Sequence, residues 1–578
     1  MTRSADMRRS IARESSCAIL KNRHGYKEAD SHVIFLRIRF SVSGKNAFYP
    51  LTEMSSQRAQ NAGKGDVSVN ILLYEGSLRN RVPLCSELGL ARSNDARETE
   101  LAILSAGYRR WGKKLPCHLY GSFAFVILDE DGQLFCARDA FGVETFYYCE
   151  TDNGVLLYGC DLREITKSPR YRKALDRQAL QLYALFGYPV GDRTLYAGIR
   201  KLPPGCMLIW NGTNVRIDRW HTLSFHPNPT VSEEAWAEEI DRTLQEILDE
   251  DRARFDFSRC GSFLSGGVDS SYLLASSGVR DAFGIGFEEA EVSELPASAA
   301  AARAMGARLH EVRVRAEEFF DVIPRFLRNL ELPLADLCAP VFALGCEREA
   351  EKSSVCLSGE GADEFFGGYY VYARADELGR EGALYCGCDG IMKQEEGMQL
   401  LGDEKAVPLE GLVAECSMQT QDAEPLSCML AVDTALWLEG DILFGVGRSA
   451  RASGIELLLP FSDRRMFALS AAIPASLKRK DGTAKYILRK AAEKRLPHAI
   501  AFRRKQGFSV PVQQWFREER FRPQIERALF GSVSGACFDQ ALLRDRWNSF
   551  LNGDDRDWTV LYMVYIFVLW YENCFEAT

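Results

Sequence analysis

The stretch Phe263–Ser271 reads F-L-S-G-G-V-D-S-S, and it sets the fold predicted for this 578-residue chain. An apolar strand is predicted to end at Leu264, and a helical pattern begins at Tyr272. The two glycines between them let backbone N–H groups approach an anion, and the helix N-terminus adds partial positive charge. A strand, a glycine turn and a helix start together predict a phosphate-binding loop.

Hydroxyl and carboxylate side chains in this loop narrow the prediction. Ser265, Ser270 and Ser271 can donate hydrogen bonds to phosphate oxygens. Asp269 would repel a bare phosphate, so its presence indicates a bridging Mg²⁺ ion. We therefore expect the loop to bind the pyrophosphate part of a nucleotide.

Strand and helix patterns alternate after the Pro227-Asn228-Pro229 linker, which predicts parallel strands joined by crossover helices. The predicted strands are residues 260–264, 282–287, 310–314 and 354–357, and the predicted helices are 231–248, 295–305 and one ending at residue 330. We expect the strand at 354–357 to close the series. Ligands of such sheets bind at the carboxyl ends of the strands, where the glycine loop lies.

A second acidic loop follows the last predicted strand. Leu357–Gly368 reads L-S-G-E-G-A-D-E-F-F-G-G and carries Glu360, Asp363 and Glu364. A solvated turn with a helix cap would explain this loop if it stood alone. Because both acidic loops directly follow strands of one predicted sheet, a shared Mg²⁺–pyrophosphate clamp explains the pair better.

A basic run near the C-terminus, Phe502–Phe508, reads F-R-R-K-Q-G-F and places cations beside a glycine and between aromatic residues. Such a run is usually a solvated face. Here its aromatic flanks favour a role in neutralising phosphate charge. The seven histidines show no metal-ligand spacing, and the lone C-x-C of Cys386 and Cys388 is best interpreted as two ordinary thiols.

The first half of the chain is rich in strand patterns and turn signals. Strands are predicted at 32–42, 70–74, 121–128, 133–138, 144–150, 154–159, 206–210 and 215–220, and a helix at 97–111. Repeated hairpins with a few helices predict two antiparallel sheets with helices packed outside. We expect a polar extension at 1–31, this domain at 32–225, and an α/β domain at 226–578. The last is mainly helical beyond residue 369 and poorly patterned over 375–430.

The composition, with 46% hydrophobic and 26% charged residues, is that of a soluble globular protein. The net charge of −9 shows no excess of basic residues of the kind that nucleic-acid binding requires. The longest apolar run, residues 560–571, is too short to cross a bilayer and predicts a buried C-terminal helix. Without a secretory signal or paired zinc spacing, the 17 cysteines predict a reducing, cytoplasmic setting.

Taken together, these motifs resemble those of the asparagine synthetase family, whose synthetase domain is a PP-loop (pyrophosphatase-type) ATP-binding fold. The synthetase motifs it resembles are S-G-G-x-D-S at 265–270, L-S-G-E-G-x-D-E-x-F-G-G at 357–368, V-P-F-L-D at 459–463, K-Y-L-L-R at 485–489, and K-x-G-F-x-V-P at 504–508 and 510–511. Residues 121–125, 137–139 and 201–205 resemble its glutaminase-type domain. The resemblance runs from about His32 to Tyr571. It implies an N-terminal α+β sandwich of the Ntn-hydrolase type and a C-terminal parallel-sheet α/β domain with a helical end.

The resemblance implies a reaction in two steps. A carboxylate attacks the α-phosphorus of ATP, which gives an acyl-adenylate and releases pyrophosphate. An amine then displaces AMP, and an amide bond forms. This chemistry needs backbone donors and Mg²⁺ for the leaving pyrophosphate, a cation near the α-phosphate, and a dry pocket for the adenylate.

The same resemblance implies roles for individual residues. Pyrophosphate would contact Ser265, Gly266, Gly267 and Ser270, and the nucleotide would be lined by Leu264, Ile285, Ser358 and Gly359. Mg²⁺ would be held by Asp269 and Asp363. The implied catalytic residues are Lys505, which would stabilise negative charge in the transition states, and Glu360, where the acyl-adenylate and the amine meet.

The sequence departs from the family's glutamine site. The family's nucleophile is an N-terminal cysteine, whereas Thr2 stands at position 2 here and no cysteine begins the first predicted strand. Cys17 would need cleavage after Ser16. The family's N-G-E becomes residues 74–76, Y-E-G, and its aspartate before T-E becomes Glu98. We therefore assign no glutaminase nucleophile and expect this domain to be inactive.

The acyl pocket departs as well. The family's L-V-K-V-D-R becomes L-F-G-V-G-R at Leu443–Arg448, and S-L-E-A-R-V-P-F becomes G-I-E-L-L-L-P-F at Gly454–Phe461. An arginine that could pair with an amino-acid carboxylate is replaced by Leu458. These lost charges disfavour free aspartate and favour a larger or less polar substrate.

Three functions follow in order of preference. The first is an intramolecular cyclase like the β-lactam synthetases and lasso-peptide macrolactam cyclases, which lack the glutaminase cysteine and join a carboxylate and an amine of one substrate. Its partners would be a carboxylate-bearing substrate such as a precursor peptide, its amine, and a leader peptidase. The second is asparagine synthetase, driven by ammonia or glutamine. The third is a non-catalytic homologue, which the intact Asp269, Glu360, Asp363 and Lys505 disfavour.

Overall fold

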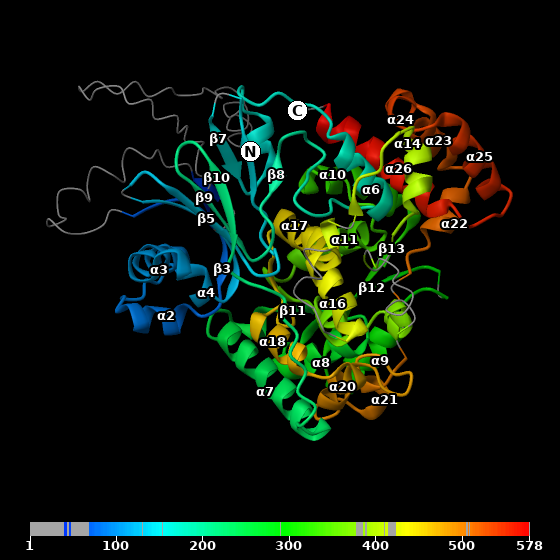
Figure 1. The fold of residues 1–578 in the computed structure, drawn as a ribbon. Coiled ribbons are helices and arrows are strands. Elements are labelled where there is room, and N and C mark those ends of the chain that lie inside the picture. Colours follow the sequence, from blue (N-terminus) through cyan, green and yellow to red (C-terminus); the bar gives the residue numbers. More distant parts are fainter. Residues whose placement is uncertain are drawn as a thin grey trace, which may run out of the picture.

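The computed structural model describes most of the chain as two domains packed side by side (Figure 1). The described residues are 40–42, 45–47, 69–129, 131–152, 154–289, 291–376, 385, 387, 390–409, 411–413, 424–504, 507 and 509–576. The predicted extension at 1–31, most of the strand predicted at 32–42, much of 375–430, and Lys505 lie outside them.

The N-terminal domain holds two antiparallel sheets, as predicted. One has the order β10-β9-β5-β4-β3 and the other β7-β6-β8. Their bounds are β3 Asn70–Leu78, β4 Gly121–Leu128, β5 Leu134–Arg138, β6 Tyr147–Glu150, β7 Leu156–Gly159, β8 Arg200–Lys201, β9 Cys206–Trp210 and β10 Val215–Arg219. A short hairpin, β1 Phe40–Val42 and β2 Lys45–Ala47, precedes them.

Alternation along β4 builds the cores on both faces of the larger sheet. Ala124 and Val126 pack with residues of the smaller sheet such as Leu156. Phe123 and Phe125 point to the other face and pack with helix residues. The helices of this domain are α2 Arg81–Leu88, α3 Ala96–Trp111, η1 Gly112–Lys114, α4 Leu115–His118, α5 Leu162–Thr166 and α6 Arg177–Phe186.

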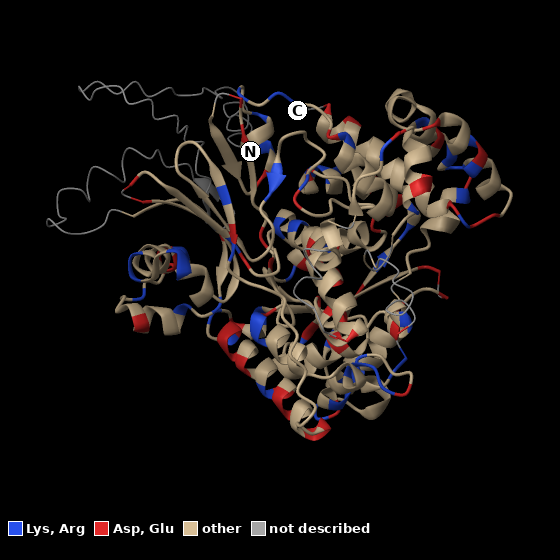
Figure 2. Cartoon of the chain, viewed as in Figure 1, with Lys and Arg blue, Asp and Glu red and all other residues tan. Residues whose placement is uncertain are grey.

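The C-terminal domain is built on a five-stranded parallel sheet of order β13-β12-β11-β14-β15. The strands are β11 Gly261–Phe263, β12 Asp281–Phe287, β13 Arg308–Val314, β14 Val355–Leu357 and β15 Glu456–Leu458. The connecting helices are α7 Glu233–Arg252, η2 Phe257–Arg259, α8 Val268–Ser277, α9 Leu295–Met305, α10 Ala316–Leu330 and α11 Cys338–Ala350. Acidic residues recur along α7 and colour much of its ribbon red in Figure 2.

One prediction about this sheet is wrong. The strand at 354–357 does not close the series, because β15 adds to its free edge in register with it. β15 has only three residues and comes about a hundred residues later in the chain, so no local alternation announces it. The pairing matters for the site, since the amide of Ser358 donates to the carbonyl of Leu458 at 3.0 Å.

The rest of the domain is helical, as expected beyond residue 369. The described helices are α12 Ala362–Phe366, η3 Tyr370–Arg374, α14 Gln394–Leu401, α16 Pro425–Ala435, η4 Leu438–Leu443, α17 Phe444–Ser453, α18 Arg464–Ala472, α19 Ala475–Lys478, α20 Tyr486–Ala492, α21 His498–Ala501, α22 Val512–Arg517, α23 Arg522–Phe530, α24 Ser532–Cys537, α25 Gln540–Leu551, α26 Trp558–Trp570 and η5 Tyr571–Phe575.

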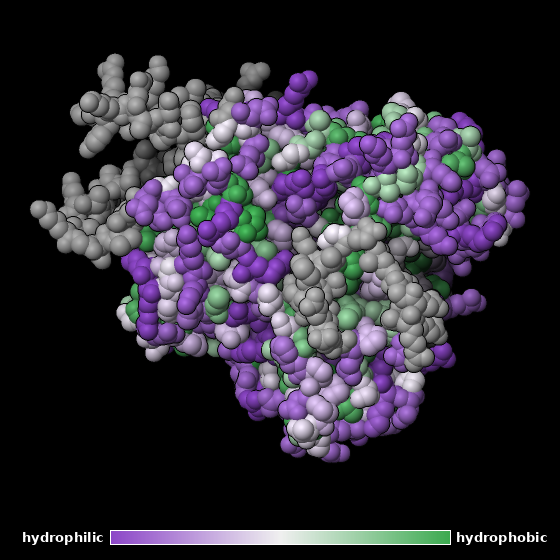
Figure 3. All heavy atoms as spheres, viewed as in Figure 1, coloured by the Kyte–Doolittle hydropathy of each residue, from purple (hydrophilic) through white to green (hydrophobic). Residues whose placement is uncertain are grey.

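The apolar C-terminal run forms a buried helix, as predicted. Residues 560–570 of α26 are all buried, packed among helices α10, α23 and α25. In the part of the chain that the structure describes, no helix is both long and apolar enough to cross a membrane. The visible face in Figure 3 is mostly hydrophilic, with apolar residues in small groups.

A buried ion-pair group joins the two domains. The carboxylate of Glu439, on η4, accepts from Arg138 at 2.8 Å and from Lys201 at 2.6 Å. All three side chains are at most 4% exposed. Removing one partner of such a group leaves an uncompensated buried charge, so these contacts fix how the domains pack.

Lys478 is a buried lysine whose ammonium is poorly compensated. The residue is 1% exposed, and its Nζ has no hydrogen-bond partner among the described residues. Burial lowers its pKa from 10.5 to about 7, and Glu424 opposes this only in part. The native state therefore binds fewer protons than the unfolded state between about pH 7 and 10.5, so the free energy of unfolding rises with pH in that window.

Lys478→Met is expected to stabilise the protein in a pH-dependent way. The gain in unfolding free energy should be roughly 2 to 5 kcal/mol at pH 6 and should vanish as the pH approaches 10.5. Denaturant unfolding at a series of pH values measures it. Lys480→Met, at a lysine that is 39% exposed, is the control and should show little change. A gain from Lys478→Met that is independent of pH would contradict this account.

Candidate active site

The glycine loop lies between β11 and α8, as the sequence predicts. Gly266 has φ +74°, and a Cβ there would lie 2.5 Å from the carbonyl carbon of Ala297, so only glycine fits. Gly267 precedes the first turn of α8. The carbonyl of Leu264 accepts from the Ser298 hydroxyl at 2.7 Å, which anchors the end of the strand against α9. The loop thus presents the N-terminus of α8 at the carboxyl edge of the sheet.

Two serines set the shape of this loop. The hydroxyls of Ser265 and Ser270 lie 3.1 Å apart, and the amide of Ser265 donates to the Ser270 hydroxyl at 3.2 Å. The amide of Gly267 donates to the Ser265 hydroxyl at 3.2 Å. Ser271, by contrast, is fully buried, so its hydroxyl does not reach the loop surface where the sequence suggested a phosphate donor.

Lys485 joins the two acidic loops. Its ammonium lies 2.5 Å from Asp269 Oδ2 and 2.8 Å from Asp363 Oδ1, so both predicted metal ligands lie around one point. The lysine side chain is 2% exposed, and its backbone is left-handed at φ +54°. A Cβ on Gly368 would come within 1.8 Å of Asp363 Oδ1 and 2.1 Å of Lys485 Cε. Strained backbone and a required glycine at one place are typical of functional sites.

The charges around Lys485 suit a divalent cation. Two carboxylates face one ammonium, and Asp269 Oδ1 is buried without a hydrogen-bond partner among the described residues. No group of three His, Cys, Asp or Glu side chains that could hold a metal alone occurs in the described ranges. Mg²⁺ commonly binds through one or two carboxylates together with substrate phosphates, so Asp269 and Asp363 fit such an ion.

Glu360 lies beside this pair in the second acidic loop. The Ser358 hydroxyl donates to Glu360 Oε1 at 2.9 Å, and the Ser462 hydroxyl donates to the Glu360 carbonyl at 2.8 Å. Burial raises the pKa of Glu360, and the carboxylates of Asp363 and Asp269 raise it further. A carboxylate with a raised pKa is a stronger base than an ordinary carboxylate and is suited to accept a proton.

The remaining predicted nucleotide residues lie at the ends of neighbouring strands. Ile285 is half-buried on β12 against Gly345 of α11. Ser358 is buried, and Gly359 lies close to Asp269, since a Cβ there would be 3.3 Å from the Asp269 Cβ. Because β12, β11 and β14 are adjacent, the structure gathers these residues at one edge of the sheet.

The basic run reaches the glycine loop through its first arginine. Arg503 Nη1 donates to the Gly266 carbonyl at 3.0 Å. Arg489 holds the same segment, because its Nη1 donates to the carbonyls of Ala501 at 2.7 Å and Arg503 at 2.9 Å. Lys505 itself lies outside the described residues.

Sequence reasoning missed the role of Lys485. The residue was visible only as the first letter of a K-Y-I-L-R motif, and nothing nearby in the sequence pointed to the acidic loops. One signal could have found it. The K-Y-I-L-R motif begins with a basic residue, and it belongs to the same set of synthetase motifs as the two acidic loops.

The altered acyl-pocket segments contribute mainly packing. Leu458 is buried in β15, and Gly445 packs against Leu334 and Ala339 of the same domain. Arg448 points to the N-terminal domain, where it donates to the Thr145 hydroxyl at 3.0 Å and the Cys160 carbonyl at 2.8 Å. Arg448 is therefore occupied in the domain interface.

Comparison with known proteins agrees with this architecture. The asparagine synthase family model matches residues 240–572, and the glutamine amidotransferase domain model matches 50–221. Asparagine synthetase [glutamine-hydrolyzing] 1 of Bacillus subtilis is 27% identical over 547 residues, covering 86% of this chain and 85% of its own length. A putative asparagine synthetase of Mycobacterium bovis is 28% identical over 553 residues, covering 87% and 84%. Amidase chry2 of Gibberella zeae is 26% identical over 342 residues, covering 54% and 48%.

An amidotransferase-type antiparallel domain joined to a parallel-sheet domain with this edge site defines a carbon–nitrogen ligase that forms amides and releases AMP. The chain belongs to the asparagine synthase family, whose members use ATP.

Proposed function

We propose that this protein activates a carboxylate as an acyl-adenylate and closes it onto an amine of the same substrate, forming a lactam or macrolactam. The observation that supports it most strongly is the meeting of Asp269, Asp363 and Lys485 beside the glycine loop, with Glu360 next to them. A cluster that gathers cation-binding groups at a helix N-terminus is suited to a leaving pyrophosphate.

In the first half-reaction a carboxylate oxygen of the substrate bonds to the α-phosphorus of ATP, and pyrophosphate leaves. The loop amides and the hydroxyls of Ser265 and Ser270 stabilise the leaving charge, and Lys505 neutralises charge near the α-phosphate. Leu264, Ile285, Ser358 and Gly359 line the nucleotide. When Mg²⁺ is bound, it would be held by Asp269 and Asp363 and supply positive charge to the phosphates.

In the second half-reaction the amine nitrogen bonds to the acyl carbon, and AMP leaves with the carboxylate oxygen. Glu360 lies where it can orient the amine and accept its proton, since burial and neighbouring carboxylates raise its pKa. Such a base acts only on the second step. Glu360 is therefore expected to matter for amide formation more than for adenylation.

Loss of charge in the acyl pocket supports an internal amine over free aspartate. Leu458 is apolar where an arginine would pair with an amino-acid carboxylate, and Arg448 is occupied in the domain interface. A precursor peptide with its leader peptidase is the substrate system proposed. Every cysteine in the described ranges is free of disulfide, which supports a reducing, cytoplasmic setting.

Asparagine synthesis from aspartate is the second candidate, and the names of the similar proteins favour it. Carboxylate-dependent exchange of labelled pyrophosphate into ATP separates the two, with L-aspartate and a short linear peptide bearing a free amino terminus and an aspartate side chain as probes. Exchange with the peptide alone supports the cyclase. Exchange with free aspartate would overturn it. If neither the peptide nor aspartate supports any exchange, the result would support a non-catalytic homologue. Genes for a short precursor peptide and a peptidase beside this one would add support.

The N-terminal domain is proposed to lack glutaminase activity. Glu75 pairs with Arg451 of the synthetase domain at 3.7 Å, and the exposed Glu98 accepts from the Ser93 hydroxyl at 2.8 Å, so both altered positions are engaged elsewhere. Glutamate release from glutamine should stay at the level of a no-enzyme blank, with ATP present or absent. An enzyme-coupled glutamate assay measures this, and release above the blank would restore a glutamine-hydrolysing reaction.

A further inference from the structure

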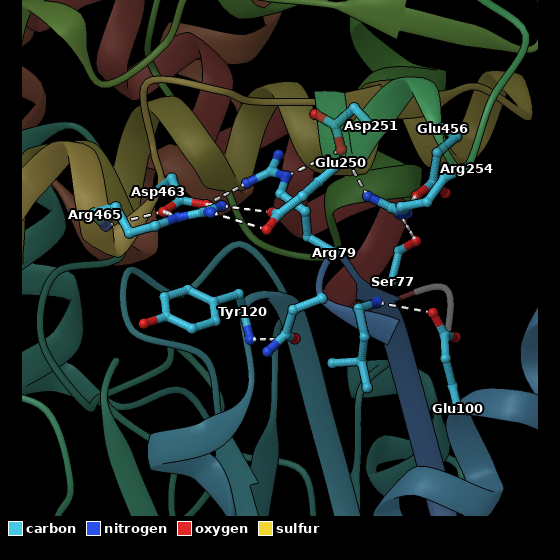
Figure 4. A network of polar contacts seen from close by, with 12 residues as sticks. Ser77, Arg79, Glu100, Tyr120, Glu250, Asp251, Arg254, Glu456, Asp463 and Arg465 are labelled. Carbon is cyan, nitrogen blue, oxygen red and sulfur yellow. Dashed lines mark hydrogen bonds and ion pairs between the residues drawn. The ribbon is translucent and has the colours of Figure 1, made fainter. Parts of the chain in front are cut away.

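A small cavity of about 50 Å³ lies between the two domains, close behind the Glu360 loop. The N-terminal domain lines it with the start of β4 and the loop 139–143. The C-terminal domain lines it with β15 and the loop Leu459–Arg464. Buried charges cross the interface beside this cavity, and Figure 4 shows them converging on Arg79.

Arg79 follows β3 in the N-terminal domain and binds two carboxylates of the other domain. Its Nη1 donates to Asp463 Oδ2 at 2.6 Å, and its Nε donates to Asp251 Oδ1 at 3.0 Å. The three side chains are 6%, 1% and 0% exposed. Burial opposes ionisation of Asp463, but Arg79 and Arg465 outweigh it and hold its pKa at about 2. The Arg79–Asp463 contact is thus a buried ion pair between the domains.

Asp463 is covalently next to the residue that holds Glu360. The Ser462 hydroxyl donates to the Glu360 carbonyl, and a Cβ on Gly361 would lie 2.5 Å from that hydroxyl oxygen. At the other end of the loop, the amide of Ser358 donates to the Leu458 carbonyl. Residues 458–463 therefore hydrogen-bond to the Glu360 loop at two places, and Arg79 binds the same segment through Asp463.

We infer that Arg79 is a positioning residue through which the N-terminal domain sets the place of Glu360 for amide formation. The inference rests on the proposed role of Glu360 in the second half-reaction. It assigns a role in the ligase reaction to a domain that is proposed to lack glutaminase activity. Because Asp269 and Lys485 are held by other contacts, adenylation is expected to depend on this link less than amide formation does.

The network contains a matched control. Arg254 is 5% exposed, bonds Asp251 at 2.9 Å and the Ser77 hydroxyl of the N-terminal domain, and pairs with Glu456 of β15 at 3.6 Å. Unlike Arg79, it makes none of these contacts with Asp463. If the two arginines only stabilised the packing of the domains, Arg254→Met and Arg79→Lys would have similar effects on the measured rates and on deuterium uptake. If Arg79 positions Glu360, changes at Arg79 and Asp463 lower the rate of amide formation much more than Arg254→Met does.

The experiment compares the full-length protein with Asp463→Asn, Arg79→Lys and Arg254→Met. Asparagine keeps the volume of Asp463 and its cap on α18, where Asp463 Oδ1 accepts from the amide of Arg465 at 2.9 Å. The first readout is pyrophosphate exchange into ATP with L-aspartate and with the linear peptide. The second is closure of the linear peptide to its lactam, followed by mass spectrometry. The third is deuterium uptake by the amides of residues 358–361, which needs no substrate.

Asp463→Asn and Arg79→Lys should lower lactam formation roughly ten- to a hundredfold and speed deuterium uptake at 358–361. They should lower exchange by no more than about threefold, because Ser358 and Gly359 also line the nucleotide. Arg254→Met should change the lactam rate and that uptake by no more than about twofold. Equal effects of all variants, or unchanged lactam formation in Asp463→Asn, would overturn the inference. If the unaltered protein shows no exchange, the proposed function fails, and unchanged deuterium uptake would then separately refute the coupling of Arg79 to the loop.

Discussion

Asp269→Asn should lower carboxylate-dependent pyrophosphate exchange by roughly a thousandfold or more, which corresponds to about 4 kcal/mol of lost transition-state stabilisation. Asp269 is one of two carboxylates at the Lys485 ammonium, and its Oδ1 is buried without a hydrogen-bond partner among the described residues. An amide at this position has no charge for a metal ion and turns an N–H toward it. Every step that separates pyrophosphate from the α-phosphorus depends on that charge.

The control is Asp281→Asn, at the opposite end of the same sheet. Asp281 starts β12 and bonds His310 at 2.7 Å, with 28% of its side chain exposed compared with 20% for Asp269. It should leave exchange within about twofold, because it is remote from the carboxyl edge where ligands of such sheets bind. Exchange by Asp269→Asn at the unaltered rate would remove this residue from the metal role.

Lys485→Met should have the second largest effect. The change removes the cation between Asp269 and Asp363 and should lower exchange by roughly a hundredfold, because the carboxylates repel each other and the phosphates lose a positive charge. Without nucleotide, however, Mn²⁺ should bind the variant more tightly, since the ammonium no longer competes for the same oxygens. Electron paramagnetic resonance of free Mn²⁺ measures that affinity independently of catalysis.

Lys480→Met is the matched comparison for this variant. Lys480 lies five residues earlier and pairs with Glu233 at 2.7 Å, with 39% of its side chain exposed. It should change neither exchange nor Mn²⁺ binding. Weaker Mn²⁺ binding in Lys485→Met than in the unaltered protein would contradict the idea that ammonium and metal share one position.

The fold was largely predictable because its signals are local. Alternation in β4 and the turn before β5 predicted a hairpin, and the apolar run at 560–571 predicted the buried helix α26. The phosphate loop was predictable for the same reason. The end of the strand, the glycine turn and the start of the helix all lie within the nine residues Phe263–Ser271. One short segment therefore determines the backbone geometry of the loop.

Features that join distant segments were not predictable in the same way. β15 has three residues and gains its stability from pairing with β14, which leaves no periodic signal. Lys485 meets Asp269 across 216 positions, and Arg79 meets Asp463 across 384. Such contacts depend on the packed fold, since charged residues at these positions would also suit an exposed surface.

The proposed adenylation requires a bond between an oxygen of the substrate carboxylate and the α-phosphorus of ATP. The most direct test labels the carboxylate of the linear peptide, and of L-aspartate, with ¹⁸O and follows the label through one complete reaction with ATP and Mg²⁺. With the peptide, AMP should carry one ¹⁸O atom from the carboxylate and pyrophosphate should be unlabelled, which is the outcome that adenylation predicts. Label found in inorganic phosphate beside ADP, or AMP released without label, would contradict it.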